Sequence, residues 1–261
     1  MRTITSLFHL ALTALTIAAL SPLLLGTHMT RNKRTRREHI RLSSRLLHLW
    51  ARVATRGLGI RVVVKGRSSA RPSGPVFFTS NHMGYMDIVI LASVQPFTFV
   101  SKKEAGTWPV LGPMIRAAGT LFVDRENRGE TAAFAELTAQ WLRDGADIVI
   151  FPEGTSANGE RVLPFKSSLF AVPVKVGAVV QPLTINYISW GGRPFSRKIR
   201  DNICWYGDMT LAPHLWNLFS RRGLVVEVIF AEAIPPGLDR KALAAEAHRR
   251  VSDAFSPCPE D

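Results

Sequence analysis

Short apolar runs alternate along most of this chain with segments that repeat apolar residues every three to four positions. A short apolar run bounded by turn residues predicts a buried strand, whereas the wider spacing predicts an amphipathic helix. The alternation extends from about residue 60 to the C-terminus and predicts an α/β fold, with a mostly parallel central sheet flanked by helices. Strands are predicted over 60–64, 75–79, 97–101, 120–123, 147–151, 179–187 and 224–230, and helices over 104–118, 129–143, 167–176, 211–222 and 240–255, with a further helix beginning at residue 88 and an irregular basic loop over 190–201.

The N-terminal segment has a different pattern. Residues 4–25 are predominantly apolar, and their length is close to the roughly 20 residues that a membrane-spanning helix needs. A dense cationic cluster follows without a convincing cleavage site, so we expect an uncleaved anchor rather than a signal peptide. The pattern leaves open whether this anchor crosses the bilayer once or forms a shallow hairpin.

A second N-terminal helix is predicted over 38–58, where leucines and Trp50 recur at helical spacing and four arginines form another stripe. Such a helix can lie in the headgroup layer of a membrane, or it can pack on its own domain. Because an apolar anchor comes immediately before it, we favour the membrane interpretation. We therefore divide the chain into an N-terminal membrane-contact element, residues 1–58, and an α/β domain, residues 59–261.

Nearly all of the excess charge lies beside this anchor. The chain has a formal net charge of +13, and residues 31–71 contain 13 basic residues against the single acid Glu38. A basic block can bind an anionic membrane surface or nucleic acid. It adjoins an apolar run and lacks the interleaved aromatic residues that stack on bases, so we expect a membrane partner and no nucleic acid. Positive charge after the anchor predicts an inner-membrane protein with the following domain on the cytoplasmic side.

Two cysteines, Cys204 and Cys258, are far apart in the sequence. This spacing matches neither a disulfide framework nor a zinc site. We expect two reduced thiols in a cytosol-facing domain, no metal site and no redox cofactor.

A histidine and an aspartate occupy one predicted strand-to-helix turn, in the sequence Asn81-His82-Met83-Gly84-Tyr85-Met86-Asp87. In α/β proteins, ligands bind where such turns leave the carboxyl ends of the strands. A carboxylate that accepts from one imidazole nitrogen fixes the tautomer and leaves the other nitrogen free as a base. His82 and Asp87 are therefore candidates for acid–base chemistry.

Further polar motifs follow other predicted strands, where functional residues concentrate. Taken alone, each has an ordinary explanation, such as a surface ion pair, a turn followed by a helix cap, or an edge strand. Their order suggests that they converge on one edge of the sheet. The motifs are Lys102 with Lys103-Glu104, the block 119–125 ending in Asp124-Arg125, the block 151–155 containing Glu153-Gly154-Thr155, and Gln181-Pro182-Leu183.

From about residue 77 to residue 187, these motifs resemble the glycerolipid acyltransferases, most closely the bacterial lysophosphatidate acyltransferases. His82 and Asp87 match the family's His-x4-Asp motif, and the later blocks match its remaining motifs in order. The resemblance implies that His82 removes a proton from an acceptor hydroxyl while Asp87 orients the imidazole. The acceptor would be a lysolipid, and the acyl donor and co-substrate would be acyl-CoA or acyl carrier protein.

The resemblance also implies roles for residues around this pair. Lys102 and Arg125 would bind an acceptor phosphate, and Glu153 would bind acceptor hydroxyls or support Arg125. Backbone N–H groups near Gly84 or Gly154 are candidate oxyanion donors. The full set comprises catalytic His82 and Asp87, substrate-binding Lys102, Arg125, Glu153, Gly154 and Thr155, and pocket-shaping Gly84 and Pro182.

One position departs from the lysophosphatidate enzymes. Their third block usually continues with an arginine after the threonine, whereas here Ser156 follows, and the next cation is Arg161. We expect 1-acyl-sn-glycerol-3-phosphate as the acceptor, with lyso-ornithine lipid as the alternative because it lacks a phosphate. A membrane lipid-binding protein without catalysis is a third possibility, which the presence of His82, Asp87, Arg125 and Glu153 disfavours.

Overall fold

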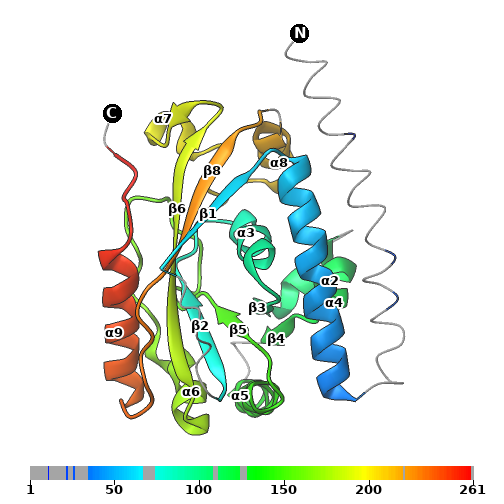
Figure 1. Cartoon of the computed structure of the whole chain (residues 1–261), viewed down its shortest axis with the longest axis vertical. Coiled ribbons are helices and arrows are strands. Elements are labelled where there is room, and N and C mark those ends of the chain that lie inside the picture. Colours follow the sequence, from blue (N-terminus) through cyan, green and yellow to red (C-terminus); the bar gives the residue numbers. More distant parts are fainter. Residues whose placement is uncertain are drawn as a thin grey trace.

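The computed structural model describes residues 35–66, 74–107, 111–123, 128–219 and 221–259, with isolated positions 11, 22 and 26. Arg125 and almost all of the expected anchor over 4–25 lie outside the described residues. The remainder forms one large sheet with helices on both faces (Figure 1). The predicted α/β fold class is therefore confirmed.

The elements follow the predicted order closely. The strands are β1 (Arg61–Lys65), β2 (Val76–Ser80), β3 (Thr98–Lys102), β4 (Leu121–Val123), β5 (Ile148–Ile150), β6 (Val179–Trp190), β7 (Arg193–Pro194) and β8 (Leu224–Phe230). The helices are α2 (Arg36–Gly57), α3 (Met86–Val94), α4 (Leu111–Ala117), α5 (Arg128–Arg143), α6 (Ala171–Val176), α7 (Arg197–Arg200), α8 (Leu211–Phe219) and α9 (Arg240–Asp253), and the 3-10 turns are η2 (Lys103–Thr107) and η3 (Ser167–Phe170).

Three predicted elements have a different form in the structure. The single helix expected over 104–118 is divided into η2 and α4, and its sequence contains Gly106, Pro109 and Pro113, which are poor helix formers. The helix expected over 167–176 likewise begins as η3 before α6. The loop expected over 190–201 contains the end of β6, the short strand β7 and the short helix α7.

The strand order is β1-β8-β6-β2-β5-β3-β4, and β7 pairs with β6. The strands from β6 to β4 in this order are parallel, whereas β8 is antiparallel to β6 and parallel to β1. The carboxyl ends of β2, β3, β4 and β5 therefore meet at one edge of the sheet. The His-x4-Asp motif follows β2, and Lys102 is the last residue of β3. The block 119–125 contains β4, and the block 151–155 follows β5.

Alternate residues of the central strands build a core on each face. Phe78 and Val149 belong to one cluster, which includes residues of α2 and α3. Phe77 and Ile148 belong to the other, which includes residues of α5, α6 and α9. Figure 1 shows α9 on one side of the sheet and α3 with α2 on the other. This burial on both faces explains why the strands read as continuous apolar runs.

Pro182 lies in an interior strand rather than at an edge. Its carbonyl accepts from the Ala231 backbone N–H, 3.1 Å away, at the point where the chain has just left β8. The antiparallel ladder between β6 and β8 begins one residue later, at Leu183. The missing N–H of Pro182 therefore falls outside the regular ladder, which is how an interior strand accommodates a proline.

Helix α2 packs on the domain through one face and exposes another. Thr35 and Glu38 form a capping box that starts the helix. Its buried face lies against α3, where the Nδ1 atom of His48 hydrogen-bonds to the carbonyl of Ala92 at 2.7 Å. Among the residues that the structure describes, no helix is both long and apolar enough to cross a bilayer. The exposed face of α2 carries a stripe formed by Arg41, Arg45, Leu49, Arg52 and Arg56.

Candidate active site

The turn after β2 begins with an asparagine that extends the sheet through its side chain. The Nδ2 of Asn81 donates to the carbonyl of Ile185 at 3.0 Å, and its Oδ1 accepts from the backbone N–H of Ile185 at 2.8 Å. Asn81 thus pairs with β6 while its own backbone leaves the strand direction. This contact fixes the point at which His82 leaves the sheet.

His82 and Asp87 form the expected pair. The Nδ1 of His82 lies 2.8 Å from Oδ2 of Asp87, and the histidine side chain is 17% exposed. The ring of Phe151 stacks on the imidazole with centroids 4.0 Å apart. The Nε2 atom has no hydrogen-bond partner within the described part of the chain. With Nδ1–H held by a carboxylate, Nε2 is the basic nitrogen available to a substrate.

Asp87 is completely buried, and four donors surround its carboxylate. Besides the imidazole, Oδ2 accepts from the backbone N–H groups of Met83, at 2.6 Å, and Gly84, at 2.9 Å. The Tyr187 hydroxyl donates to Oδ1 at 2.7 Å. A buried carboxylate is tolerated only when it is satisfied in this way. Burial raises the pKa of Tyr187, so its hydroxyl remains a neutral donor.

Glu153, which follows β5, stabilises the same turn through hydrogen bonds. Its Oε1 accepts from the backbone N–H of His82 at 2.7 Å, and its Oε2 accepts from that of Leu163 at 2.9 Å. The side chain is 3% exposed, and burial raises its pKa to about 8. Both oxygens are therefore occupied within the protein. These contacts hold the backbone of His82 and the loop at Leu163 together, while the expected roles of Glu153, binding acceptor hydroxyls or supporting Arg125, stay predictions.

Replacing Glu153 by glutamine should change how stability depends on pH. The pKa of Glu153 is raised from 4.5 to about 8, so the folded protein retains a proton that the unfolded chain releases. The contribution of this group to the free energy of unfolding is full below the lower pKa and is lost as pH rises through the higher one. Relative to Glu153→Gln, the unaltered protein should lose on the order of a few kcal/mol across that window.

Urea unfolding at a series of pH values measures this difference. Glutamine keeps the size of the side chain but does not titrate, so it is the matched reference. Glu153→Gln should also be less stable at low pH by about 1–3 kcal/mol, because its amide nitrogen opposes one backbone donor. A difference between the two proteins that stays constant with pH would contradict the buried, titrating carboxyl.

The backbone N–H groups suggested for the oxyanion already have acceptors. Gly84 donates to Asp87, and Gly154 donates to the carbonyl of Phe151 at 3.1 Å. Gly84 instead permits a close approach of two backbones, because a Cβ atom there would lie 2.9 Å from the nitrogen of Trp205. In this conformation, the backbone N–H of neither glycine is a free donor.

The other motif residues lie along the carboxyl edge of the sheet. Lys102 is exposed at the end of β3 and pairs in register with Val123, the last residue of β4. Arg125, two positions further on, lies outside the described residues. Thr155 is exposed after β5, and Arg161 is exposed without an ion-pair partner among the described residues. The structure thus brings His82, Asp87 and Glu153 together and leaves Lys102 exposed at the carboxyl edge of the sheet.

Three contributors to the site carry no local sequence signal. Tyr187 is 100 positions from Asp87 in sequence, and Asn81 contacts β6 at a similar separation. Trp205 donates its backbone N–H to the carbonyl of Met83 at 2.8 Å. One indication of the place of Tyr187 comes from the sequence, because this residue ends the strand expected over 179–187. In the described part of the chain, no cluster of histidine, cysteine or acidic residues could hold a metal ion.

Comparison with known proteins identifies the family. Residues 61–186 match a family model described as acyltransferase. The chain is 38% identical over 77% of its length to the lyso-ornithine lipid O-acyltransferase of Rhizobium meliloti, covering 70% of that protein. It is 30% identical over 68% of its length to the 1-acyl-sn-glycerol-3-phosphate acyltransferase of Neisseria gonorrhoeae, covering 66% of it.

A solved structure shows the same fold. The 1-acyl-sn-glycerophosphate acyltransferase PlsC from Thermotoga maritima superimposes with a TM-score of 0.67 at 21% identity, covering 96% of this chain and 95% of that one. The His82–Asp87 pair lies inside the segment that the family model matches. The chain therefore belongs to the acyltransferase family.

Proposed function

We propose that this acyltransferase moves an acyl chain from a thioester to the free hydroxyl of a lysolipid. The observation that carries the chemistry is a half-buried imidazole whose Nδ1 is held by Asp87 and whose Nε2 is free of protein partners among the described residues. Nε2 removes the hydroxyl proton, and the alkoxide oxygen attacks the thioester carbonyl to give a tetrahedral intermediate. This intermediate collapses with cleavage of the C–S bond, which leaves the new ester, and the departing thiolate takes the proton from the imidazolium.

We propose acyl-CoA or acyl carrier protein as the donor and a membrane as the place of reaction. The acceptor is a lipid, and the described part of the N-terminal segment presents the arginine stripe of α2. Anionic lipid attracts such a surface. In this proposal, the catalytic domain works on the cytoplasmic side of the inner membrane.

Lyso-ornithine lipid is the acceptor that we favour. Four relatives, 34–38% identical, carry the name lyso-ornithine lipid O-acyltransferase. Ala157 donates its N–H to the carbonyl of His82 at 2.7 Å, so the neighbouring position 156 lies beside the catalytic turn. That position is Ser156, which adds no positive charge. An ornithine headgroup offers a carboxylate and an ammonium, and so needs fewer cations than a phosphate does.

The second candidate is 1-acyl-sn-glycerol-3-phosphate, which the sequence motifs first suggested. Lys102 at the carboxyl edge of the sheet and Arg125 beyond β4 are cations suited to a phosphate. The relatives that carry this name are more distant, at 30% identity or less. A lipid-binding protein without catalysis is disfavoured, because the His82–Asp87 pair is complete.

An acceptor panel tests the headgroup. Purified full-length protein, given a labelled acyl donor, should acylate lyso-ornithine lipid with a higher kcat/KM than lysophosphatidate. Ser156→Arg should shift this ratio toward lysophosphatidate by about tenfold, since a charge-assisted contact contributes about 1.5–3 kcal/mol. Ser156→Gln, which is larger but uncharged, is the matched control. Preferential acylation of lysophosphatidate by the unaltered protein would instead support the second candidate.

A further inference from the structure

Helix α8 presents an uncharged face to solvent. Its sequence from Leu211 to Phe219 contains no acidic residue, lysine or arginine. Ala212, Pro213, Trp216 and Asn217 are exposed on one side of the helix, and the Trp216 ring is among the most exposed large apolar side chains of the described residues, at 47%. A tryptophan on an apolar helical face is typical of segments that lie at a membrane interface.

The opposite side of α8 is fixed to the catalytic turn. His214 is buried, and its Nδ1 lies 2.7 Å from the hydroxyl of Tyr85, which sits between His82 and Asp87 in the sequence. Its Nε2 lies 3.0 Å from the carbonyl of Cys204. Burial raises the pKa of Tyr85 and lowers that of His214, so both stay neutral. The tyrosine therefore donates to Nδ1, and Nε2–H donates to the carbonyl.

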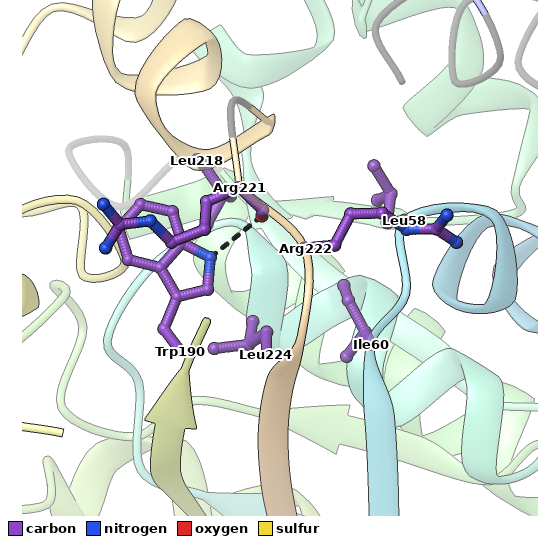
Figure 2. Close-up of a pocket in the computed structure, with 7 residues that line it drawn as sticks. All are labelled: Leu58, Ile60, Trp190, Leu218, Arg221, Arg222 and Leu224. Atoms are coloured by element: carbon purple, nitrogen blue, oxygen red, sulfur yellow. Dashed lines mark hydrogen bonds between the residues drawn. The ribbon is translucent and has the colours of Figure 1, made fainter. Parts of the chain in front are cut away.

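Two arginines extend this face toward α2. Arg221 lies across the Trp190 ring, 4.8 Å from the ring centroid, and Arg222 points toward Leu58 at the end of α2 (Figure 2). The Nη2 of Arg222 donates to the carbonyl of Gly57 at 3.3 Å. The arginine stripe of α2 ends at Arg56, one residue before this contact. Arg222 therefore lies beside the end of the helix that carries this stripe.

We propose that α8, together with Arg221 and Arg222, is a second membrane-contact surface, which binds an anionic bilayer beside the active site. The partner is inferred from charge complementarity, because an uncharged, tryptophan-bearing face is followed by two arginines, with one exposed acid, Asp208, three positions before the helix. The inference rests on the proposed membrane association and adds a contact made by the catalytic domain itself. Contact through α8 brings the turn that carries His82 close to the lipid surface.

A fluorescent probe on α8 tests this surface. The full-length Trp216→Cys variant is labelled with an environment-sensitive thiol probe, since the native Cys204 and Cys258 are buried. Vesicles of phosphatidylcholine and phosphatidylglycerol should shift the emission to the blue and strengthen it, and vesicles of phosphatidylcholine alone should do so less. Leu238→Cys, 40% exposed next to α9 on the other side of the sheet, is the matched control and should not respond.

The charged part of the surface is tested in the same assay. Replacing Arg221 and Arg222 by glutamine in the labelled protein should raise the phosphatidylglycerol content needed for a half-maximal shift. Each replacement should weaken binding to the vesicles about fivefold. Co-sedimentation with vesicles and acyl transfer in detergent are measured in parallel. If the protein sediments with vesicles and turns over substrate but the probe at position 216 does not respond, the α8 inference fails while the proposed function stands.

Two other outcomes would also overturn the inference. Failure to sediment with vesicles would remove the membrane association and the α8 contact together, while acyl transfer in detergent would still report separately on the proposed chemistry. A blue shift that appears without vesicles and grows with protein concentration would show that this face binds a second copy of the chain.

Discussion

Replacement of His82 by alanine is expected to reduce acyl transfer by about a hundredfold to ten-thousandfold, because general-base catalysis contributes about 10²–10⁴ and the acceptor hydroxyl is a poor nucleophile without it. The Nδ1 atom of the His82 imidazole is held by Asp87, and its Nε2 atom has no hydrogen-bond partner among the described residues. Steady-state kcat with purified protein and a labelled acyl donor measures the loss. The binding of acceptor should change much less than turnover.

The fold should survive this substitution. The backbone contacts of residue 82, with Glu153 and Ala157, do not involve the imidazole. Loss of the stacking on Phe151 should cost only about 1 kcal/mol beyond lost burial. His248→Ala makes the same chemical change on α9, across the sheet, and should leave turnover unchanged. Comparable turnover by His82→Ala and the unaltered protein would end the assignment of His82 as the base.

Asp87→Asn is expected to reduce kcat by about a hundredfold to ten-thousandfold, because a neutral amide cannot stabilise the imidazolium that forms when His82 takes a proton. The amide can still fit. Its oxygen can accept from His82, Met83 and Gly84, and its nitrogen can face the Tyr187 hydroxyl, which also accepts. The loss would then come from the missing charge rather than from a disordered turn. Kinetics and urea unfolding on the same preparations separate the two causes.

Tyr187→Phe is the matched control for Asp87→Asn. It keeps the aspartate charge and its contact with His82, but it leaves Oδ1 of Asp87 without a partner among the described residues. Stability should fall by about 1–3 kcal/mol, the usual cost of an unsatisfied buried group, and kcat should fall less than in Asp87→Asn. If Asp87→Asn retained full turnover, or if both variants lost turnover equally, the charge of Asp87 would not be what supports catalysis.

The local parts of the site were readable from the sequence. The strand-to-helix turn of His82 and Asp87 is encoded by an apolar run, a short polar segment and the start of a helix, all within a few positions. The parallel order of strands then implied that Lys102, Glu153 and the turn share one edge. Both predictions depend on short-range periodicity and on a general rule about α/β sheets. Neither requires knowledge of contacts between residues far apart in the sequence.

The contacts that finish the site could not be read in this way. The bonds of Tyr187 to Asp87 and of Asn81 to Ile185 join residues about one hundred positions apart, and no local pattern specifies them. The sequence could not reveal that Asp87 accepts from Gly84, which removes that N–H as an oxyanion donor. It also could not reveal that both oxygens of Glu153 accept from backbone N–H groups, which ties the backbone of His82 to that of Leu163.

The sequence of helix α2 did not show which of its apolar residues face the core. Apolar residues at helical spacing fit a membrane-facing stripe and a core-facing stripe equally well. In the structure, Leu47 and Ala51 are buried in the core against α3, while Leu49 and Val53 are exposed with the arginines. One helix therefore serves the domain core on one face and presents a cationic face elsewhere, and periodicity alone could not divide its leucines between the two.

Mass spectrometry of the reaction product tests whether His82 supports acylation of the lipid hydroxyl. Purified protein, a labelled acyl thioester and lyso-ornithine lipid are incubated, in parallel with the same lipid lacking its free hydroxyl and with the His82→Ala variant. We expect a labelled ester on the hydroxyl, formed by the unaltered protein alone and only on the lipid that carries the hydroxyl. Labelled product on the lipid without a hydroxyl, or equal product from His82→Ala, would contradict this expectation.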